Sequence, residues 1–256
     1  MHTPSSEAIE TIYYPESDGE PMAETAVHRD LMIDTIYGLD TFFNEEPLVH
    51  VSGNLLIYYV EGDPSRSVAP DVFLVRGVDK RPRRTYLLWK EGHVPDVVIE
   101  FTSKTTWRED VQKKWRLYGQ LGVKEYYLYD PLREYLPEPL MAYRRDAGGE
   151  YQPVPVVGGR VKSEVMGLEL VDTGETLRLY DPVGQRFLPT VKEERQARQR
   201  AEAERARAEA ERQAEAQARA RAEAERQTEA AARQRAEHEL AQLREELERL
   251  RRKADH

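Results

Sequence analysis

The 256-residue sequence contains no cysteine, which excludes disulfide frameworks and thiolate metal sites and makes a reducing cytoplasm the expected setting. It has no apolar run of about 18 residues, so no transmembrane helix is expected. Its first ten residues carry acid rather than base and lack the apolar core of a signal peptide. A Gly-x-Ser-x-Gly elbow, a phosphate-binding glycine loop and a zinc-ligand cluster are also missing from the sequence. We therefore expect a soluble, cytoplasmic protein without a membrane partner.

Positive charge is scarce in most of the chain. The formal net charge is −9, and residues 190–256 carry 17 basic and 16 acidic side chains, so the excess of acid lies entirely in residues 1–189. An acidic body is not the usual footprint of a tight nucleic-acid binder. The acidic balance does not exclude contact with nucleic acid, because a metal site concentrates carboxylates and a local basic rim can still bind phosphate.

Composition divides the chain into three parts. Residues 1–22 are polar and interrupted by proline, which predicts an arm with little structure of its own, although Ile12-Tyr13-Tyr14 is apolar enough to pack on the body. Residues 23–189 alternate short apolar runs with turns and predict an α/β domain. Residues 190–256 have no glycine or proline and consist mainly of Ala, Glu, Arg and Gln, which predicts one long helix.

The end of this helix carries leucines at heptad spacing. They follow one another at intervals of three, four and three residues: Leu240, Leu243, Leu247 and Leu250. This spacing is the seam of a coiled coil, and we expect it to form a homodimer or to bind a partner helix. One interpretation of the whole chain is therefore a scaffold without catalytic activity, whose coiled coil mediates protein association.

Apolar spacing predicts the elements of residues 23–189. Glu24 to Asn44 has helical spacing, and the runs Leu48–Val51 and Leu55–Val60, separated by a Gly-Asn step, predict a hairpin. Strand, helix and strand follow one another between residues 97 and 129, which predicts a right-handed βαβ unit. Residues 141–179 alternate short apolar pieces with glycine turns, so we expect small antiparallel strands that cover the sheet edge.

Three polar side chains lie in apolar surroundings. Asp71 and Glu100 each border a short β-branched or aromatic run that is typical of a buried strand. A carboxylate there is costly to desolvate unless a positive group compensates it. Lys114 falls in the middle of the apolar face when residues 107–121 are placed on a helix, and an inward lysine is rarely unpaired. We expect Lys114 to meet either Asp110, four residues earlier, or the two acids Asp71 and Glu100.

The stretch that holds these residues resembles a known family. Its quoted parts are Pro95-Asp96-Val97-Val98-Ile99-Glu100-Phe101-Thr102-Ser103, then Asp110, Lys114 and Tyr118, then Gly122-Val123-Lys124-Glu125-Tyr126-Tyr127-Leu128-Tyr129-Asp130-Pro131. They are similar to the signature of the Uma-type restriction endonucleases, a family of the PD-(D/E)XK nuclease superfamily, and the resemblance extends from Tyr13 to Leu188. It implies a restriction-endonuclease-like mixed central sheet flanked by helices. The superfamily's usual lysine, two residues after the glutamate, is replaced by Thr102, so the role of Lys114 depends on its helix.

The resemblance also implies a chemistry. It predicts hydrolysis of phosphodiester bonds in nucleic acid, with DNA as the expected substrate and Mg²⁺ or Mn²⁺ as cofactor. Asp71, Glu100 and the backbone carbonyl of Phe101 would supply oxygen ligands, which Mg²⁺ prefers. The ion would activate water and stabilise charge on the scissile phosphate. Lys114 would orient that water or hold the phosphate.

Further residues each have two interpretations. His28, on the first helix, is an accessory group of the site or a surface or capping histidine. Asp96 is a second acid or a residue of the turn that enters the strand. Arg81, Arg83 and Arg84 lie in a basic loop between the two strands with carboxylates, where they contact the phosphate backbone or remain solvated.

Overall fold

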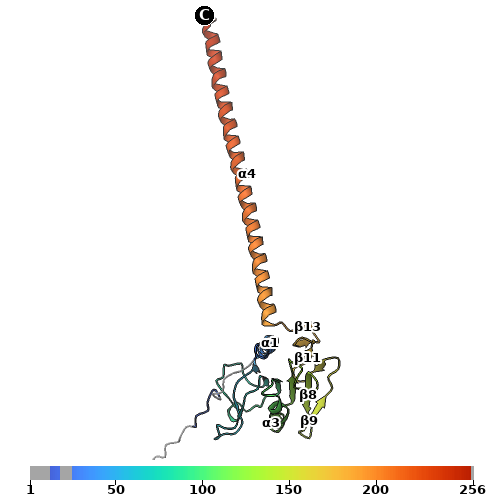
Figure 1. The fold of residues 1–256 in the computed structure, drawn as a ribbon. Helices are drawn as coiled ribbons and strands as arrows, with labels where there is room; N and C mark the ends of the chain where they lie inside the picture. The colour runs from blue at the N-terminus through green and yellow to red at the C-terminus, as the bar shows by residue number, and fades with distance from the viewer. Residues whose placement is uncertain (1–11, 18–24, 255–256) are drawn as a thin grey trace, which may run out of the picture. The chain divides into compact units, whose positions relative to one another are not determined.

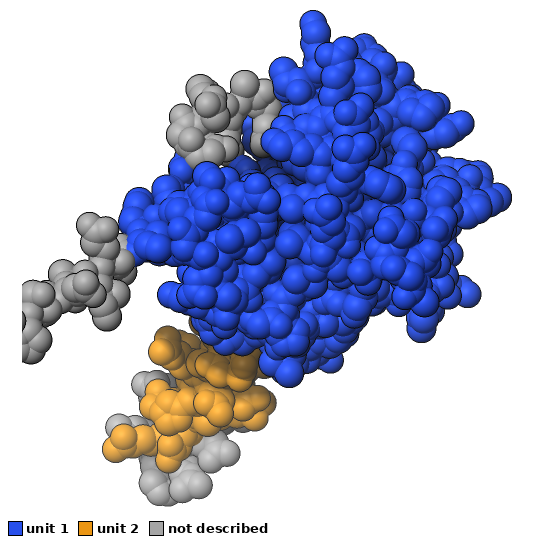
Figure 2. Space-filling view, turned by 90° about the horizontal axis from the view of Figure 1, so that it is seen from below, with its two compact units in different colours: residues 1–194 blue, residues 195–256 orange. Residues whose placement is uncertain are grey.

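A computed structural model describes residues 12–17 and 25–254 (Figure 1). Their contacts divide the chain into two compact units, residues 1–194 and 195–256, which Figure 2 colours blue and orange. In the part of the chain that the structure describes, no helix is long and apolar enough to cross a membrane. Most of the predicted N-terminal arm lies outside the described residues. Within residues 12–17, the Tyr14 ring packs 5.0 Å from the ring of Tyr58 and 5.2 Å from that of Trp89.

The centre of the first unit is a six-stranded mixed sheet with the order β1-β4-β6-β7-β8-β9. Its strands are β1 (Val49–Ser52), β4 (Val72–Arg76), β6 (Val97–Phe101), β7 (Glu125–Tyr129), β8 (Leu140–Arg145) and β9 (Tyr151–Val154). β6 and β7 run parallel, and the other neighbouring strands run antiparallel. Every residue of β6 and β7 is buried, which explains why their sequences are nearly continuous apolar runs. The predicted mixed sheet and βαβ unit are confirmed.

Each face of this sheet has its own apolar core, because successive side chains of a strand point to opposite faces. Val97, Ile99 and Phe101 pack with helix α1 (Ala26–Phe42). Val98 packs on the other side, with α3 (Trp115–Leu121) and the segment η1 (Glu109–Lys114) that precedes it. The sheet is thus a middle layer between α1 and the βαβ crossover.

Two smaller sheets complete the unit. The antiparallel sheet β10 to β13 joins the core on the α1 side through Leu170 and Leu179. Its strands are β10 (Arg160–Lys162), β11 (Glu169–Asp172), β12 (Leu177–Asp181) and β13 (Arg186–Phe187). The three-stranded sheet contains β3 (Ser67–Val68), β2 (Ile57–Tyr58) and β5 (Tyr86–Leu87), and the short helix α2 (Leu88–Glu91) follows. The predicted antiparallel strands are confirmed, but β8 and β9 extend the main sheet and β10 to β13 cover a face rather than the edge.

The predicted hairpin of residues 48–60 is wrong. β1 pairs with β4 in the main sheet, whereas β2 pairs with β3 and β5 in the three-stranded sheet. The reason lies in the step between them, where the N–H of Asn54 donates to the carbonyl oxygen of Pro70 at 2.8 Å and Asn54 has a φ of +51°. This hydrogen bond joins the turn to the segment before β4, so the chain does not fold back to pair with β1.

The predicted long helix is confirmed as α4 (Val191–Ala254). In its first turn, the N–H of Val191 donates to the Asp34 carboxylate at 3.0 Å. Leu240, Leu243 and Leu247 are each more than half exposed. The side chain of Leu250 lies outside the described part. A coiled-coil partner for these leucines stays a prediction.

Candidate active site

The antiparallel pairing of β4 and β6 brings two acids to one end of the main sheet. Asp71 lies immediately before β4, and Glu100 is the penultimate residue of β6. The Asp71 carboxylate accepts the N–H of Phe101 at 2.7 Å, and the N–H of Asp71 donates to Oε2 of Glu100 at 3.3 Å. These two bonds join the strand ends where the ladder stops. The structure therefore brings the first two predicted site residues together.

Lys114 reaches this pair from the α3 side of the sheet. Its Nζ lies 3.0 Å from Oε2 of Glu100 and 3.1 Å from Oδ1 of Asp110. The Glu100 and Asp110 side chains are only 1% exposed, and that of Lys114 is 14% exposed. The ammonium of Lys114 therefore contacts Asp110 and one of the two strand acids, Glu100, at the same time, while Asp71 pairs with His28.

A π-helical segment sets this geometry. Residues Glu109–Lys114 form η1, with the wider i→i+5 turn, before the chain continues as α3. The hydroxyl of Tyr126 on β7 donates to the backbone carbonyl of Asp110 at 3.0 Å and ties this segment to the sheet. Such π segments are often found at functional sites. A helical wheel at 100° per residue does not reveal it, although it places Lys114 on the correct face.

Two buried groups of the site were not predicted as site residues. The sequence offers Asp110 as an alternative partner of Lys114 and places both Asp110 and Tyr118 in the family signature, but it assigns neither a role in the site. The Tyr118 hydroxyl donates to Oε1 of Glu100 at 2.8 Å. A signal was present for both, because Asp110, Lys114 and Tyr118 recur every four residues and so share one face of a helix.

His28 reaches the site from the opposite layer. Its Nε2 lies 3.1 Å from Oδ1 of Asp71, and its ring packs edge-on against Phe101 with centroids 5.8 Å apart. The residue is 5% exposed, so a surface histidine is the wrong description. Its backbone N–H is capped by Oγ1 of Thr25 at 3.2 Å, which fixes the start of α1. Asp71 is thus held between α1 and the sheet end.

The pKa values of the site follow from burial and from these contacts. Burial would raise the pKa of Asp71, but the His28 side chain and the Lys114 charge hold it below its usual range. Burial raises the pKa of Glu100 well above its usual range, and Asp71 and Asp110 add to this effect. Burial would lower the pKa of Lys114, but the three nearby acids raise it. The lysine therefore stays charged among more acids than it neutralises.

Asp96 does not join this group. It precedes β6, at the strand end opposite to Glu100, and four residues of strand separate the two by roughly 13 Å. Its carboxylate accepts the N–H of Arg76 at 2.6 Å and pairs with Lys124 at 2.7 Å. These contacts agree with the alternative of a residue in the turn that enters the strand.

The loop with the predicted phosphate contacts begins at the other end of β4 from Asp71, because the loop follows this strand and Asp71 precedes it. Each arginine pairs with acid: Arg81 and Arg83 with Asp79 and Glu91, and Arg84 with Glu16. The Arg83 side chain is 3% exposed, whereas that of Arg84 is 83% exposed. Contact with phosphate stays a prediction for all three, and Arg84 is the most accessible of them.

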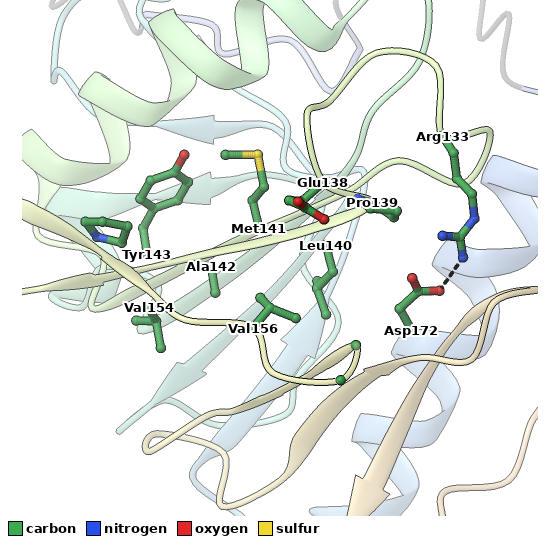
Figure 3. A pocket seen from close by; sticks show the side chains of 13 residues that line it. Arg133, Glu138, Pro139, Leu140, Met141, Ala142, Tyr143, Val154, Val156 and Asp172 are labelled. Carbon is green, nitrogen blue, oxygen red and sulfur yellow. Dashed lines mark hydrogen bonds and ion pairs between the residues drawn. The ribbon is translucent and has the colours of Figure 1, made fainter.

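A cavity of about 520 Å³ lies beside β8 (Figure 3). Leu140 and Ala142 point to one side of the strand there, Met141 and Tyr143 to the other, and the Arg133–Asp172 ion pair of 2.7 Å lies at its border. Leu140 pairs with Tyr129, which in turn pairs with Phe101. The cavity therefore starts two strands from the acids, about 10 Å away at the usual strand spacing, and is separate from them.

The donor set at the sheet end suits a divalent cation. In the described residues, no group of three or more His, Cys, Asp or Glu is arranged to hold a metal ion. Mg²⁺ does not need such a cage, because it is commonly held by one or two carboxylates, with water and substrate phosphate as its other ligands. Asp71 and Glu100 provide such a pair, and the buried acids outnumber the single lysine. The residues present therefore fit Mg²⁺ or Mn²⁺.

The chain is similar to one family of proteins in sequence and to a solved structure. The sequence model of one family, Uma2, described as "Putative restriction endonuclease", matches residues 7–174, which is more than half of the chain. Among solved structures, the chain is similar to a "putative nuclease belonging to DUF820 from Anabaena variabilis ATCC 29413", with 16% sequence identity and a TM-score of 0.42. That similarity covers 56% of this chain and 75% of the other. No curated protein matches the sequence.

Proposed function

The chain belongs to the Uma2 family, whose description is "Putative restriction endonuclease", and from this premise we propose that it is a metal-dependent endonuclease. Its reaction is the hydrolysis of phosphodiester bonds in nucleic acid, with DNA as the substrate. One observation carries the proposal: Asp71, Glu100 and Lys114 converge at a single end of the sheet. Buried charge of this kind is costly to a fold and is typical of functional sites.

Each group has a role that its contacts support. Asp71 and Glu100 would hold Mg²⁺ or Mn²⁺, with the Phe101 carbonyl as a further ligand, and the ion would stabilise charge on the phosphate and lower the pKa of a bound water. Lys114 keeps a positive charge beside these acids, suited to the charge that develops on phosphate. His28 fixes the orientation of Asp71 from α1. Among the predicted phosphate contacts Arg81, Arg83 and Arg84, the exposed Arg84 is the best placed, whereas Arg83 is buried against Asp79 and Glu91 and would first have to leave them.

The long helix supports a further proposal about assembly. The exposed leucines of α4 follow a heptad seam, and such a seam is stable only when a second helix covers it. We propose that α4 joins two copies of the chain in the cytoplasm. The second candidate function, a silent scaffold with an associating coil, shares this helix and differs only in having no catalysis.

A cleavage assay separates the enzyme from the scaffold. Purified full-length protein is incubated with plasmid, single-stranded DNA or RNA in the presence of Mg²⁺, Mn²⁺ or EDTA. Asp71→Ala should abolish cutting, and Lys114→Ala should reduce it by about 100-fold or more, the typical loss when one charge-stabilising donor is removed. The matched control is Lys113→Ala, because Lys113 is adjacent, 80% exposed and paired with Glu109.

The outcomes are distinct. Cutting that needs metal, persists in Lys113→Ala and is lost in the two site variants supports the endonuclease. Equal cutting by all variants would identify a contaminant. Absence of cutting on every substrate, with intact folding, would favour the scaffold. The RNA arm decides between DNA and RNA as substrate.

A further inference from the structure

Lys114 has two acceptors, and only one of them belongs to the proposed cation site. Its ammonium bridges Oε2 of Glu100 on β6 and Oδ1 of Asp110 in η1 at nearly equal distances, 3.0 and 3.1 Å. A lysine has three N–H donors, so both bonds can exist together. The side chains of both acids are 1% exposed, so water does not readily replace either partner.

Both oxygens of the Glu100 carboxylate already accept a donor. Oε1 accepts the Tyr118 hydroxyl at 2.8 Å, and Oε2 accepts both the Lys114 ammonium and the N–H of Asp71. A divalent cation at Glu100 would therefore share an oxygen with a donor of this chain. The ammonium is the donor that repels such a cation, so the two compete for Glu100.

Asp110 is built to receive the ammonium when it leaves Glu100. The Tyr126 hydroxyl anchors the Asp110 backbone to β7 at 3.0 Å. Asp110 and Lys114 also lie four residues apart in the same π segment, so their contact does not depend on the strand acids. A lysine without this second acceptor would either hold Glu100 more strongly or swing out of the site.

We propose that Asp110 is a positioning residue for cation loading: it retains the Lys114 ammonium inside the site while a divalent cation takes Glu100. This inference rests on the proposed function, because it assumes that Asp71 and Glu100 hold the cation. It goes further by giving a role to a buried acid that is not itself a proposed ligand. The wider turn of η1 is the element that presents both residues to Glu100.

The test measures binding of Mn²⁺ alone to the full chain, without nucleic acid, by electron paramagnetic resonance of the free ion. Asp110→Asn keeps the shape and removes the charge, and we expect it to raise the Mn²⁺ Kd by about tenfold or more, as for other partners of metal ligands. The matched control is Glu109→Gln. That acid lies one residue earlier in η1, is half exposed and pairs with Lys113, so its variant should bind like the wild type.

A double-mutant cycle distinguishes positioning from simple loss of negative charge. If Asp110 acts through Lys114, the Asp110→Asn effect should disappear in a Lys114→Met background, or in Lys114→Gln if the methionine variant does not fold. The conservative Asp110→Glu should restore part of the affinity. An unchanged Kd in Asp110→Asn, or the same weakening with and without Lys114, would overturn the inference.

Failure of the proposed function gives a different result. If the wild type binds no Mn²⁺, or if Asp71→Ala and Glu100→Gln bind it as well as the wild type, the cation site itself is wrong and the role of Asp110 is wrong with it. If those two variants lose binding and Asp110→Asn does not, the cation site stands and only the role of Asp110 is refuted.

Discussion

Buried acids outside the candidate site each have their own set of hydrogen-bond donors. Glu125 accepts the hydroxyl of Tyr127 at 3.0 Å and the N–H of Glu164 at 2.8 Å, and it also contacts Ser163, Arg144 and the N–H of Val165. Asp130 accepts four backbone N–H groups from residues 132–136. A buried acid with all its hydrogen bonds made stabilises the fold, whereas Glu100 and Asp110 share one ammonium. This difference separates structural acids from the site more clearly than burial does.

His50 provides a pH-dependent prediction at this scale. Burial lowers the pKa of His50, and the Arg83 charge lowers it further, while Glu91 and Asp40 oppose the shift. Near this pKa the folded state therefore binds fewer protons than the unfolded chain. The contribution of neutral His50 to the free energy of unfolding is fully present above the unfolded pKa of about 6.5, and it is lost as the pH falls through the lowered pKa of the folded state. The wild type should lose stability on acidification in this range.

The measurement compares urea unfolding of the wild type and His50→Gln between pH 7.5 and 5.0. We expect a smaller loss of stability on acidification in the variant, because glutamine does not titrate. Comparison of the slopes removes any constant cost of the substitution itself. Parallel pH profiles would show that His50 makes no contribution.

How far the site can be predicted from sequence depends on the residue. Asp71, Glu100 and Lys114 stand out because a charge in an apolar run must find a partner, and this rule needs no tertiary information. This rule does not identify Asp110 and Tyr118, because their surroundings depend on the π segment, which the sequence does not reveal. Likewise, no local pattern shows that Arg83 is buried while Arg84, its neighbour, is exposed.

At the scale of elements, strands and helices follow from the apolar pattern, but pairing partners do not. β1 and β2 look like a hairpin because they are short, apolar and close in sequence. Their true partners are decided by the Asn54 contact with Pro70, which only the folded chain shows. The βαβ unit is easier to predict because its crossover leaves a single handedness.

Gly53, in the turn between β1 and β2, gives an element-scale prediction. A Cβ at this position would lie 2.0 Å from the carbonyl oxygen of Asp71, far inside contact distance. Gly53→Ala should therefore displace Asp71, destabilise the fold by about 1–3 kcal/mol and lower cleavage by about 100-fold. Urea unfolding and the plasmid assay measure the two effects.

The matched control is Gly38→Ala in α1, where the nearest atom to a new Cβ, on Leu188, is at an ordinary 3.5 Å. This variant should be as stable as the wild type or more stable, because alanine favours a helix by about 1 kcal/mol over glycine. Full activity in Gly53→Ala would show that the turn does not position Asp71.

At the scale of the whole molecule, the prediction concerns self-association. Leu243→Glu puts a charge into the α4 seam and should convert a dimer into a monomer, measured as mass in solution by light scattering. Ala241→Glu is the control, because it adds the same charge to α4 outside the seam. Identical masses for the wild type and Leu243→Glu would remove the assembly role of α4.

The site also joins distant parts of the sequence. His28 lies on α1, Asp71 just before β4, Glu100 on β6 and Lys114 in η1, and successive members are 43, 29 and 14 positions apart in the sequence. Under the proposed function, a chain still emerging from the ribosome cannot cut nucleic acid until Lys114 has been synthesised and its segment has docked on the sheet. Incomplete copies of the chain would then be inactive.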